Sequence, residues 1–325
     1  MITVERLLGV TDVVTHDSCH DGMGTAILIR DVLPNANFHF LQYNTEEYRN
    51  FPAGPNQLWC DFSPLPARNQ EFVDAKAIVL DHHRGADKVV AAYGDDGVFA
   101  DEKHEPGVSG AVLAFREVWV KLKQYRNGEL AEAHHFAHLV GVRDTFQTQS
   151  PFWQDACELA EVLRFVPFEM WQKPDTFRVE NIGWWLERKA LGSLLWKKHQ
   201  KSITRAIKNS HGFTTAQGTR VRYFPGNSPI TSDTCESLGK SADLVVGFSF
   251  VGIEEGLAKI VFSTRSYTGY DCLKFCKSMG GGGHTKAAGF AISFSPTVGD
   301  RDPYSLFASA LERHEAHESA QAIQP

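Results

Sequence analysis

The chain has 325 residues, of which 42% are apolar and 22% charged, and its formal net charge is −6. This composition excludes a disordered chain, and the length is sufficient for two domains with buried cores. The acidic balance argues against a broad basic surface for long nucleic acid, although a local basic pocket for a short anionic substrate is compatible with it.

Cysteine spacing and hydropathy indicate the cellular compartment in which the protein is expected. The six cysteines include no CxxC pair, and the sequence has neither a secretory signal at its start nor a run of 18 apolar residues. We therefore expect reduced thiols, a cytoplasmic location and no membrane segment.

The first half of the chain alternates short apolar runs with helical patterns. Strands are predicted at 10–15, 38–42, 57–61 and 77–81, and helices at 25–33, 109–122 and 129–140. This alternation predicts a parallel sheet covered on both faces, with function at the carboxyl ends of its strands. Three predicted strands lead directly to a titratable residue, namely His16, Asp61 or Asp81, and this is the first indication of a site.

The second half begins with a long helical pattern at 182–209. Its polar face is basic and carries Lys197, Lys198, Lys201, Arg205 and Lys208. This face is either the solvated side of a connecting helix or the lining of a cleft for an anion. His211-Gly212 is expected to end the helix. Strands predicted at 220–224, 244–251, 258–263 and 287–294 indicate a second, mixed domain, and the residues after 312 are expected to fray.

Four segments of the first half carry Asp or His at positions expected to be loops after strands, namely 16–22, 60–64, 80–85 and 141–146. Carboxylate and imidazole ligands together suit Mn²⁺ or Mg²⁺, and several of them can hold two ions about 4 Å apart for phosphoryl displacement. Taken singly, a strand-end Asp is more often a helix cap or turn residue. The adjacent pair His82-His83 is the stronger signal, whereas the trio at 134, 135 and 138 fits a surface helix.

Asp81-His82-His83, together with the other three segments, resembles the DHH phosphoesterase family. Ser109-Gly110-Ala111 resembles the SGA helix start of that family, and the GGGGHTKAAGF segment at 280–290 resembles the GGGH motif of its type 1 DHH-associated C-terminal domain. The resemblance covers nearly the whole chain in the family's order. It implies an α/β protein with a parallel-sheet DHH domain at 1–183, a linker helix at 184–211 and a smaller mixed-sheet α/β domain at 212–325.

The resemblance also implies the site residues. Two divalent ions, with Mn²⁺ favoured and Mg²⁺, Fe²⁺ or Zn²⁺ as alternatives, would be bound by His16, Cys19, Asp21, Asp61, His82 and Asp144. Asp61 would bridge the two ions. His83 would contact the scissile phosphate or assist the leaving oxygen, and Asp81 would orient a histidine.

Cys19 departs from the family pattern, in which this position is usually Asp. A thiolate at this position would favour Zn²⁺ or Fe²⁺ over Mg²⁺. Alternatively, the neighbouring His20 takes over as ligand, or Cys19 is a spectator and water fills its place.

The second domain carries the implied substrate-binding residues. Successive glycines let backbone N–H groups converge on an anion, and Arg suits bidentate phosphate recognition. The substrate-binding residues that the resemblance implies are Ser109 of the first domain and, in the second domain, Arg265, Gly281, Gly282, Gly283, His284 and Lys286. The alternative for the glycine run is a flexible hinge or turn. A cleft between the domains is expected, with metals on one wall and the glycines on the other.

The resemblance is to the nanoRNase-like (oligoribonuclease-like) and RecJ-related members of the family. It implies a metal-dependent phosphodiesterase that hydrolyses short linear oligonucleotides, especially dinucleotides such as pGpG or pApA, to mononucleotides. The alternatives are a cyclic dinucleotide phosphodiesterase, a pAp phosphatase and a catalytically weak nucleotide sensor. No binding of long duplex DNA is expected, and a homodimer is left open.

Overall fold

The computed structural model describes residues 2–43, 45–123, 129–171, 183–226, 228–295 and 302–322. Its contacts divide the chain into two compact units, Met1–Trp196 and Lys197–Pro325. The division falls within the long helix α10 (Gly183–Lys208), the helix that the sequence predicts as a linker. The Lys and Arg side chains of its predicted basic face are exposed.

The first unit contains a five-stranded parallel sheet in the order β2-β1-β3-β4-β5. Its strands are β1 (Asp12–His16), β2 (Asn37–Leu41), β3 (Gln57–Cys60), β4 (Ile78–Asp81) and β5 (Gly97–Phe99). The first four match the predicted runs to within two residues at each end, and the parallel sheet is confirmed. The strand β5 was not predicted, because three residues are too short to show a pattern.

The helices of the first unit are α1 (Val4–Leu8), α2 (His20–Val32), α3 (Glu46–Asn50), α4 (Asn69–Asp74), α5 (Asp87–Ala91), α6 (Gly110–Leu113), α7 (Val120–Leu122), α8 (Glu129–Asp144) and α9 (Trp153–Phe165). A π-helical segment, Ala114–Trp119, joins α6 to α7, so the helix predicted at 109–122 is present with one widened region. Short 3₁₀ helices lie at Pro66–Arg68, Gly94–Asp96 and Phe168–Trp171.

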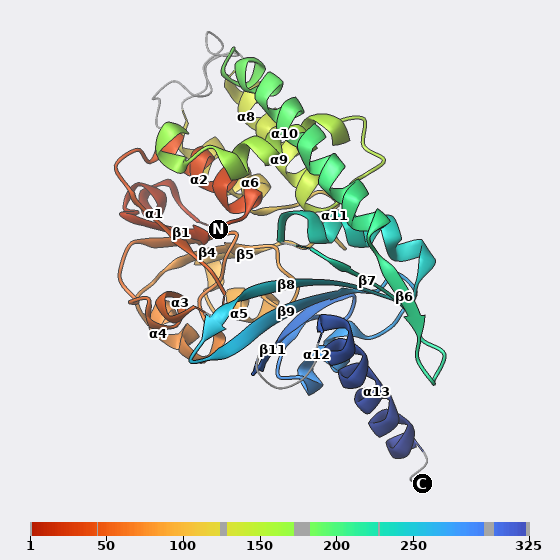
Figure 1. Ribbon diagram of the computed structural model, residues 1–325. Helices are drawn as coiled ribbons and strands as arrows, with labels where there is room; N and C mark the ends of the chain where they lie inside the picture. The colour runs from red at the N-terminus through yellow and green to blue at the C-terminus, as the bar shows by residue number, and fades with distance from the viewer. Residues whose placement is uncertain are drawn as a thin grey trace. The chain divides into compact units, whose positions relative to one another are not determined.

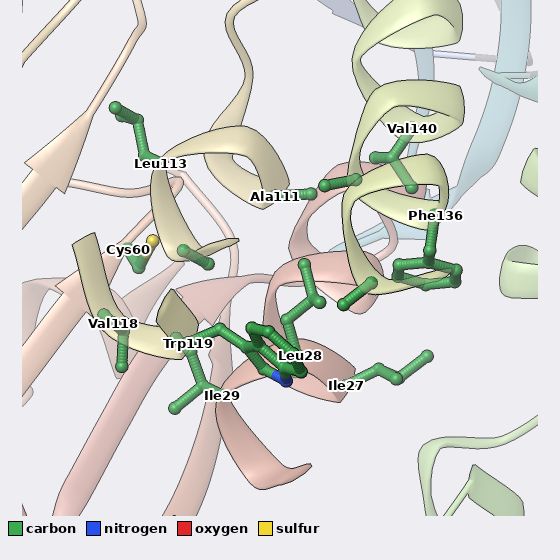
Figure 2. Close-up of a cluster of buried hydrophobic side chains, with 14 of the residues drawn as sticks. Ile27, Leu28, Ile29, Cys60, Ala111, Leu113, Val118, Trp119, Phe136 and Val140 are labelled. Carbon is green, nitrogen blue, oxygen red and sulfur yellow. The ribbon is translucent and has the colours of Figure 1, made fainter. Parts of the chain in front are cut away.

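Both faces of the parallel sheet are buried, which explains why its strands are continuously apolar. Neighbouring strand residues alternate between two cores, so that Val13 packs on one face and Val14 on the other. Helices α2, α6, α8 and α9 cover the first face, and α3, α4 and α5 cover the second (Figure 1). Figure 2 shows the first core, in which Leu28, Trp119 and Val140 approach from three helical segments. Each such buried side chain stabilises the fold by about 1.5–3 kcal/mol.

The second unit contains a six-stranded mixed sheet in the order β10-β11-β9-β8-β7-β6. Its strands are β6 (His211–Thr214), β7 (Arg220–Pro225), β8 (Leu244–Glu254), β9 (Leu257–Arg265), β10 (Gly282–His284) and β11 (Ala287–Phe294). Among the described strand pairs of this sheet, only β7 and β8 are parallel. The helices are α11 (Ser228–Leu238), α12 (Cys272–Ser278) and α13 (Pro303–Ala322), with a 3₁₀ turn at Gly239–Ser241.

Two expectations for the second unit are wrong. His211 and Gly212 do not end the long helix, since they belong to β6 and pair antiparallel with Tyr223 and Arg222 of β7. The residues after 312 do not fray before Ala322. They continue α13, because Phe307 and Leu311 anchor that helix in the core beside α12.

Two features of the structure concern membrane-spanning helices and thiols. Among the described residues, no helix is sufficiently long and apolar to cross a membrane. All six cysteines lie in the described part of the chain and are thiols outside any disulfide, and all except the partly exposed Cys19 are buried.

Candidate metal centre and phosphate-binding region

The strand order of the first unit gathers the predicted residues at one edge of the sheet. Strands β1, β3 and β4 are neighbours and parallel, so their carboxyl ends meet. His16 is the last residue of β1, Asp61 follows β3, and Asp81 is the last residue of β4. His82 follows immediately, and a parallel sheet collects such residues at its carboxyl edge.

Three further candidate ligands, His20, Asp21 and Asp144, lie in helices and not in the loops that the sequence analysis expected. The segment after β1 is not a long loop, because α2 begins at His20 and carries His20 and Asp21 in its first turn. Gly22 permits this tight entry, since a Cβ there would lie 2.1 Å from the carbonyl oxygen of His16. Asp144 follows no strand and is the last residue of α8.

The structure brings all six predicted metal ligands together. His16, Cys19 and Asp61 each offer a ligand atom, and these atoms lie within 4.8 Å of one another. Asp21, His82 and Asp144 form a second such group. The two groups are adjacent, because Nε2 of His82 lies 3.0 Å from Oδ1 of Asp61 and 3.3 Å from Oδ2 of Asp21.

Asp61 occupies the centre of this cluster in an unusual backbone conformation. Its φ is +62°, a left-handed conformation that Asp tolerates better than most residues and that is typical of functional sites. One carboxylate oxygen, Oδ1, contacts His82, whereas the buried Oδ2 has no hydrogen-bond partner among the described residues. Burial and the neighbouring Asp21 raise the pKa of Asp61 well above its usual range. A cation beside Oδ2 would satisfy this oxygen and reverse that effect.

The start of α6 holds Asp21 in place. The backbone amide of Gly110 donates to Oδ2 at 2.6 Å, and that of Ala111 donates to Oδ1 at 2.9 Å. Ser109 is the N-cap of this helix, and its Oγ accepts a hydrogen bond from the amide of Val112. Since Ser109 is fully buried, any part that it has in substrate binding would act through this cap.

His82 is surrounded by carboxylates. In addition to Asp21 and Asp61, Oδ2 of Asp144 lies 3.8 Å from its Nε2. Although burial lowers the pKa of His82, the hydrogen bonds to Asp21 and Asp61 raise it well above its usual value. Burial and Asp21 raise the pKa of Asp144 to about 6. Both shifts reflect the carboxylate charge gathered around His82, which a divalent cation would neutralise.

Gln42, which the sequence analysis did not single out, fixes the ring of His16. Its amide orientation is set because Oε1 accepts from the backbone N–H of Tyr43 and Nε2 donates to the carbonyl of Asp17. Oε1 also lies 3.0 Å from Nε2 of His16, and a carbonyl oxygen only accepts, so Nε2 carries the proton. Nδ1 is left with its lone pair free for a cation.

Asp81, which the sequence analysis expects to orient a histidine, contacts His83. Its Oδ1 lies 2.8 Å from Nδ1 of His83 and accepts from the backbone N–H of the same residue at 2.9 Å. Ser63, which the sequence analysis did not identify, donates its hydroxyl to Oδ2 of Asp81. Burial lowers the pKa of His83, but Asp81 raises it to about 9, so the imidazole is a cation at neutral pH.

The residues present fit divalent cations. Asp21 and Asp61 are almost completely buried, and desolvated carboxylates are costly unless charges of opposite sign neutralise them. Besides Oδ2 of Asp61, the buried Nε2 of His20 has no hydrogen-bond partner in the described part of the chain. Oxygen and imidazole donors are the ligands of Mn²⁺, Mg²⁺ and related ions.

In the second unit, the glycine run forms an ordered hairpin, not a flexible hinge. Strand β10 pairs antiparallel with β11, so that Gly283 faces Ala288. A Cβ on Gly281 would lie 2.1 Å from the carbonyl oxygen of Gly289, and Gly283 has a φ of +134°. The hairpin therefore requires these two glycines. A Cβ on the exposed Gly282 would meet no atom within 4 Å, so the hairpin does not require glycine there.

Arg265 lies at the same end of this sheet as the glycine run. In the register, Arg265 of β9 is opposite Ala287 of β11, which in turn is opposite His284 of β10. Nη1 of Arg265 donates to the carbonyl of Thr264, and its Nη2 lies 3.3 Å from Oγ of Ser232. Lys286 is exposed in the turn between β10 and β11, and the side chain of His284 lies outside the described part of the structure.

The comparisons with known proteins rest on structure. No protein-family model and no curated protein matches the sequence. The DHH domain of PF0399, a member of the s1p family of ribosomal proteins, aligns with a TM-score of 0.53 at 12% identity, over 95% of this chain and 88% of that one. RecJ of Thermus thermophilus in complex with Mn²⁺ aligns with a TM-score of 0.50 at 17% identity, over 97% of this chain and 53% of RecJ. The chain has the DHH fold.

The pGpG-specific phosphodiesterase PggH of Vibrio cholerae also aligns, with a TM-score of 0.41 and 16% identity over 94% of this chain and 99% of PggH. The chain spans about half the length of RecJ, so the RecJ match concerns the part of that enzyme with the DHH fold. Within the DHH fold of this chain, the predicted metal ligands occupy the carboxyl edge of the parallel sheet.

Proposed function

We propose that the protein is a metal-dependent phosphodiesterase that hydrolyses short linear oligonucleotides to mononucleotides, with dinucleotides such as pGpG or pApA as the main substrates. The observation that supports this proposal is the pair of adjacent ligand groups beside Asp61, whose Oδ2 is buried without a partner among the described residues. Adjacent sites of this kind are suited to displacement at phosphorus.

Two divalent cations would be held by the two ligand groups. Asp61 belongs to the first group and contacts His82 of the second, so it would lie between the cations. Such cations supply Lewis-acid charge for phosphate oxygens and lower the pKa of water. The imidazolium of His83 would add its positive charge to that of the cations, and Asp81 would keep this ring in one orientation. His83 is therefore placed to hydrogen-bond a phosphate oxygen or to deliver a proton to the leaving oxygen.

The proposed preference for short substrates rests on the second unit and on the overall charge. Arg265 and the hairpin of β10 and β11 offer a compact positive and glycine-lined region for one phosphate group. The net charge of −6 disfavours binding of long nucleic acid, because affinity for it depends on many simultaneous phosphate contacts.

The test is a substrate panel. Purified protein is incubated with linear dinucleotides, cyclic dinucleotides, longer RNA and pAp, each with Mn²⁺, Mg²⁺ or Zn²⁺, and the products are separated by chromatography. Release of mononucleotides that is fastest from linear dinucleotides supports the proposal. Faster turnover of cyclic dinucleotides or pAp would reassign the substrate, and binding of pGpG with no release of GMP under any metal would favour a nucleotide sensor.

Replacing Arg265 with Ala is expected to weaken substrate binding more than turnover. Loss of a charged hydrogen bond costs about 1.5–3 kcal/mol, which corresponds to an increase in KM of about 10–100-fold with kcat retained. Steady-state kinetics on a linear dinucleotide measure this effect. The matched control is Arg220→Ala, because Arg220 is exposed and paired with Asp243. An unchanged KM in Arg265→Ala would remove Arg265 from the substrate site.

A further inference from the structure

We propose that the two cation sites prefer different metals. The thiolate of Cys19 makes the site of His16, Cys19 and Asp61 a site for Zn²⁺, Fe²⁺ or Co²⁺ and not for Mg²⁺. The inference rests on the proposed metal-dependent function and adds the identity of one ligand atom. It predicts a centre with two unlike metals, one bound through sulfur and nitrogen and the other mainly through oxygen.

The first ligand group combines three donor types. Cys19 offers Sγ, His16 an imidazole nitrogen and Asp61 a carboxylate oxygen, all within 4.8 Å of one another. Since Gln42 leaves Nδ1 of His16 as its free donor, two of the three ligands are nitrogen and sulfur. Thiolate and imidazole together favour Zn²⁺ and other later transition metals.

A second imidazole lies beside the same sulfur. His20, Cys19 and Asp144 also have ligand atoms within 4.8 Å of one another. His20 is only 7% exposed, and its Nε2 has no hydrogen-bond partner in the described part of the chain. Cys19 is thus shared by two groups that each contain an imidazole.

The second ligand group has a different character. Asp21, His82 and Asp144 supply two carboxylates and one imidazole without sulfur. Such a set suits Mn²⁺ or Mg²⁺. On binding the first metal, the Cys19 thiol loses its proton to solvent, and the sulfur donates an electron pair to the cation, so that no oxidant or reductant is required.

Cobalt spectroscopy tests the sulfur bond without reference to activity. The metal-free protein is titrated anaerobically with Co²⁺, and the near-ultraviolet absorption that marks thiolate-to-cobalt charge transfer is followed. We expect this absorption to grow with the first equivalent and to stop there, while a second equivalent binds without adding to it. Excess Zn²⁺ should abolish the absorption, and excess Mg²⁺ should leave it unchanged.

Variants identify the sulfur. Cys19→Ser is expected to lose the charge-transfer absorption and to bind Zn²⁺ more weakly by at least the roughly 10–100-fold that loss of an orienting partner costs, although a second Co²⁺ still binds. Cys157→Ala is the matched control, because Cys157 is buried in α9 and belongs to none of the ligand groups of the described residues, and it should retain the absorption. Circular dichroism and the melting temperature confirm that both variants fold.

Three outcomes separate this inference from the proposed function. Binding of two Co²⁺ ions with no charge-transfer absorption in the unmodified protein would overturn the role of Cys19 and leave the metal-dependent function intact. Retention of the absorption in Cys19→Ser would assign it to another cysteine and likewise overturn the inference. Failure to bind any Co²⁺, Mn²⁺ or Zn²⁺ would remove the metal centre itself and with it the proposed phosphodiesterase.

Discussion

Replacing Asp61 with Asn is expected to reduce phosphodiesterase turnover by at least about 100-fold, because partners that merely orient a metal ligand already contribute about 10–100-fold. Asn has the same shape and tolerates the left-handed backbone conformation at this position, so the fold should be preserved. However, the amide offers one neutral oxygen where the carboxylate offers two charged ones. Metal content measured after dialysis should fall together with turnover.

The control for this prediction is Asp12→Asn. Asp12 begins β1, whereas the ligand groups lie at the carboxyl end of that strand, and Oδ1 of Asp12 pairs with His39. This change also replaces a carboxylate with an amide, but we expect metal content and kcat to stay near those of the unmodified protein. Full activity in Asp61→Asn, with intact folding shown by circular dichroism, would exclude Asp61 as the bridging ligand.

Replacing Gly110 with Ala is expected to destabilise the protein and to disrupt the metal centre at the same time. A Cβ at this position would lie 2.2 Å from Cβ of Asp61, a distance that the fold cannot accommodate without moving the start of α6. Overpacking of this kind costs about 1–3 kcal/mol. Since the amides of Gly110 and Ala111 hold the carboxylate of Asp21, the displacement should also weaken metal binding.

Urea unfolding and metal titration measure the two effects of Gly110→Ala. Gly9→Ala is the matched control, because a Cβ on Gly9 would lie 3.5 Å or more from its nearest neighbours and the backbone φ there is −78°. We expect the control to change the free energy of unfolding by less than about 0.5 kcal/mol. A Gly110→Ala protein with unchanged stability and metal affinity would show that α6 can shift freely and does not position Asp21.

The sequence was sufficient to predict the parallel sheet and the ligand-bearing strand ends, because buried parallel strands are continuously apolar. His16, Asp61 and His82 follow directly from that pattern. Asp144 was expected in a loop after a strand, and its role as a ligand came from the family resemblance. The structure instead places it at the end of α8, which a strand pattern could not predict.

The orienting groups were beyond prediction from the sequence. Gln42 and Ser63 act through single hydrogen bonds to His16 and Asp81, and such contacts depend on how loops after different strands meet in space. Similarly, a run of glycines in a sequence is compatible both with phosphate binding and with close packing in a hairpin. Only the structure shows that Gly281 and Gly283 are required by the hairpin itself.

The ligands of the proposed centre are distributed from β1 to the end of α8, and this distribution links metal supply to folding. His16 and Asp144 come from β1 and from the end of α8, elements that folding brings together, so cations would bind the folded unit far more tightly than the unfolded chain. Metal starvation would therefore do more than remove activity. It would enlarge the unfolded population and expose the chain to proteolysis, so that cellular abundance of the protein would follow the concentration of its metals.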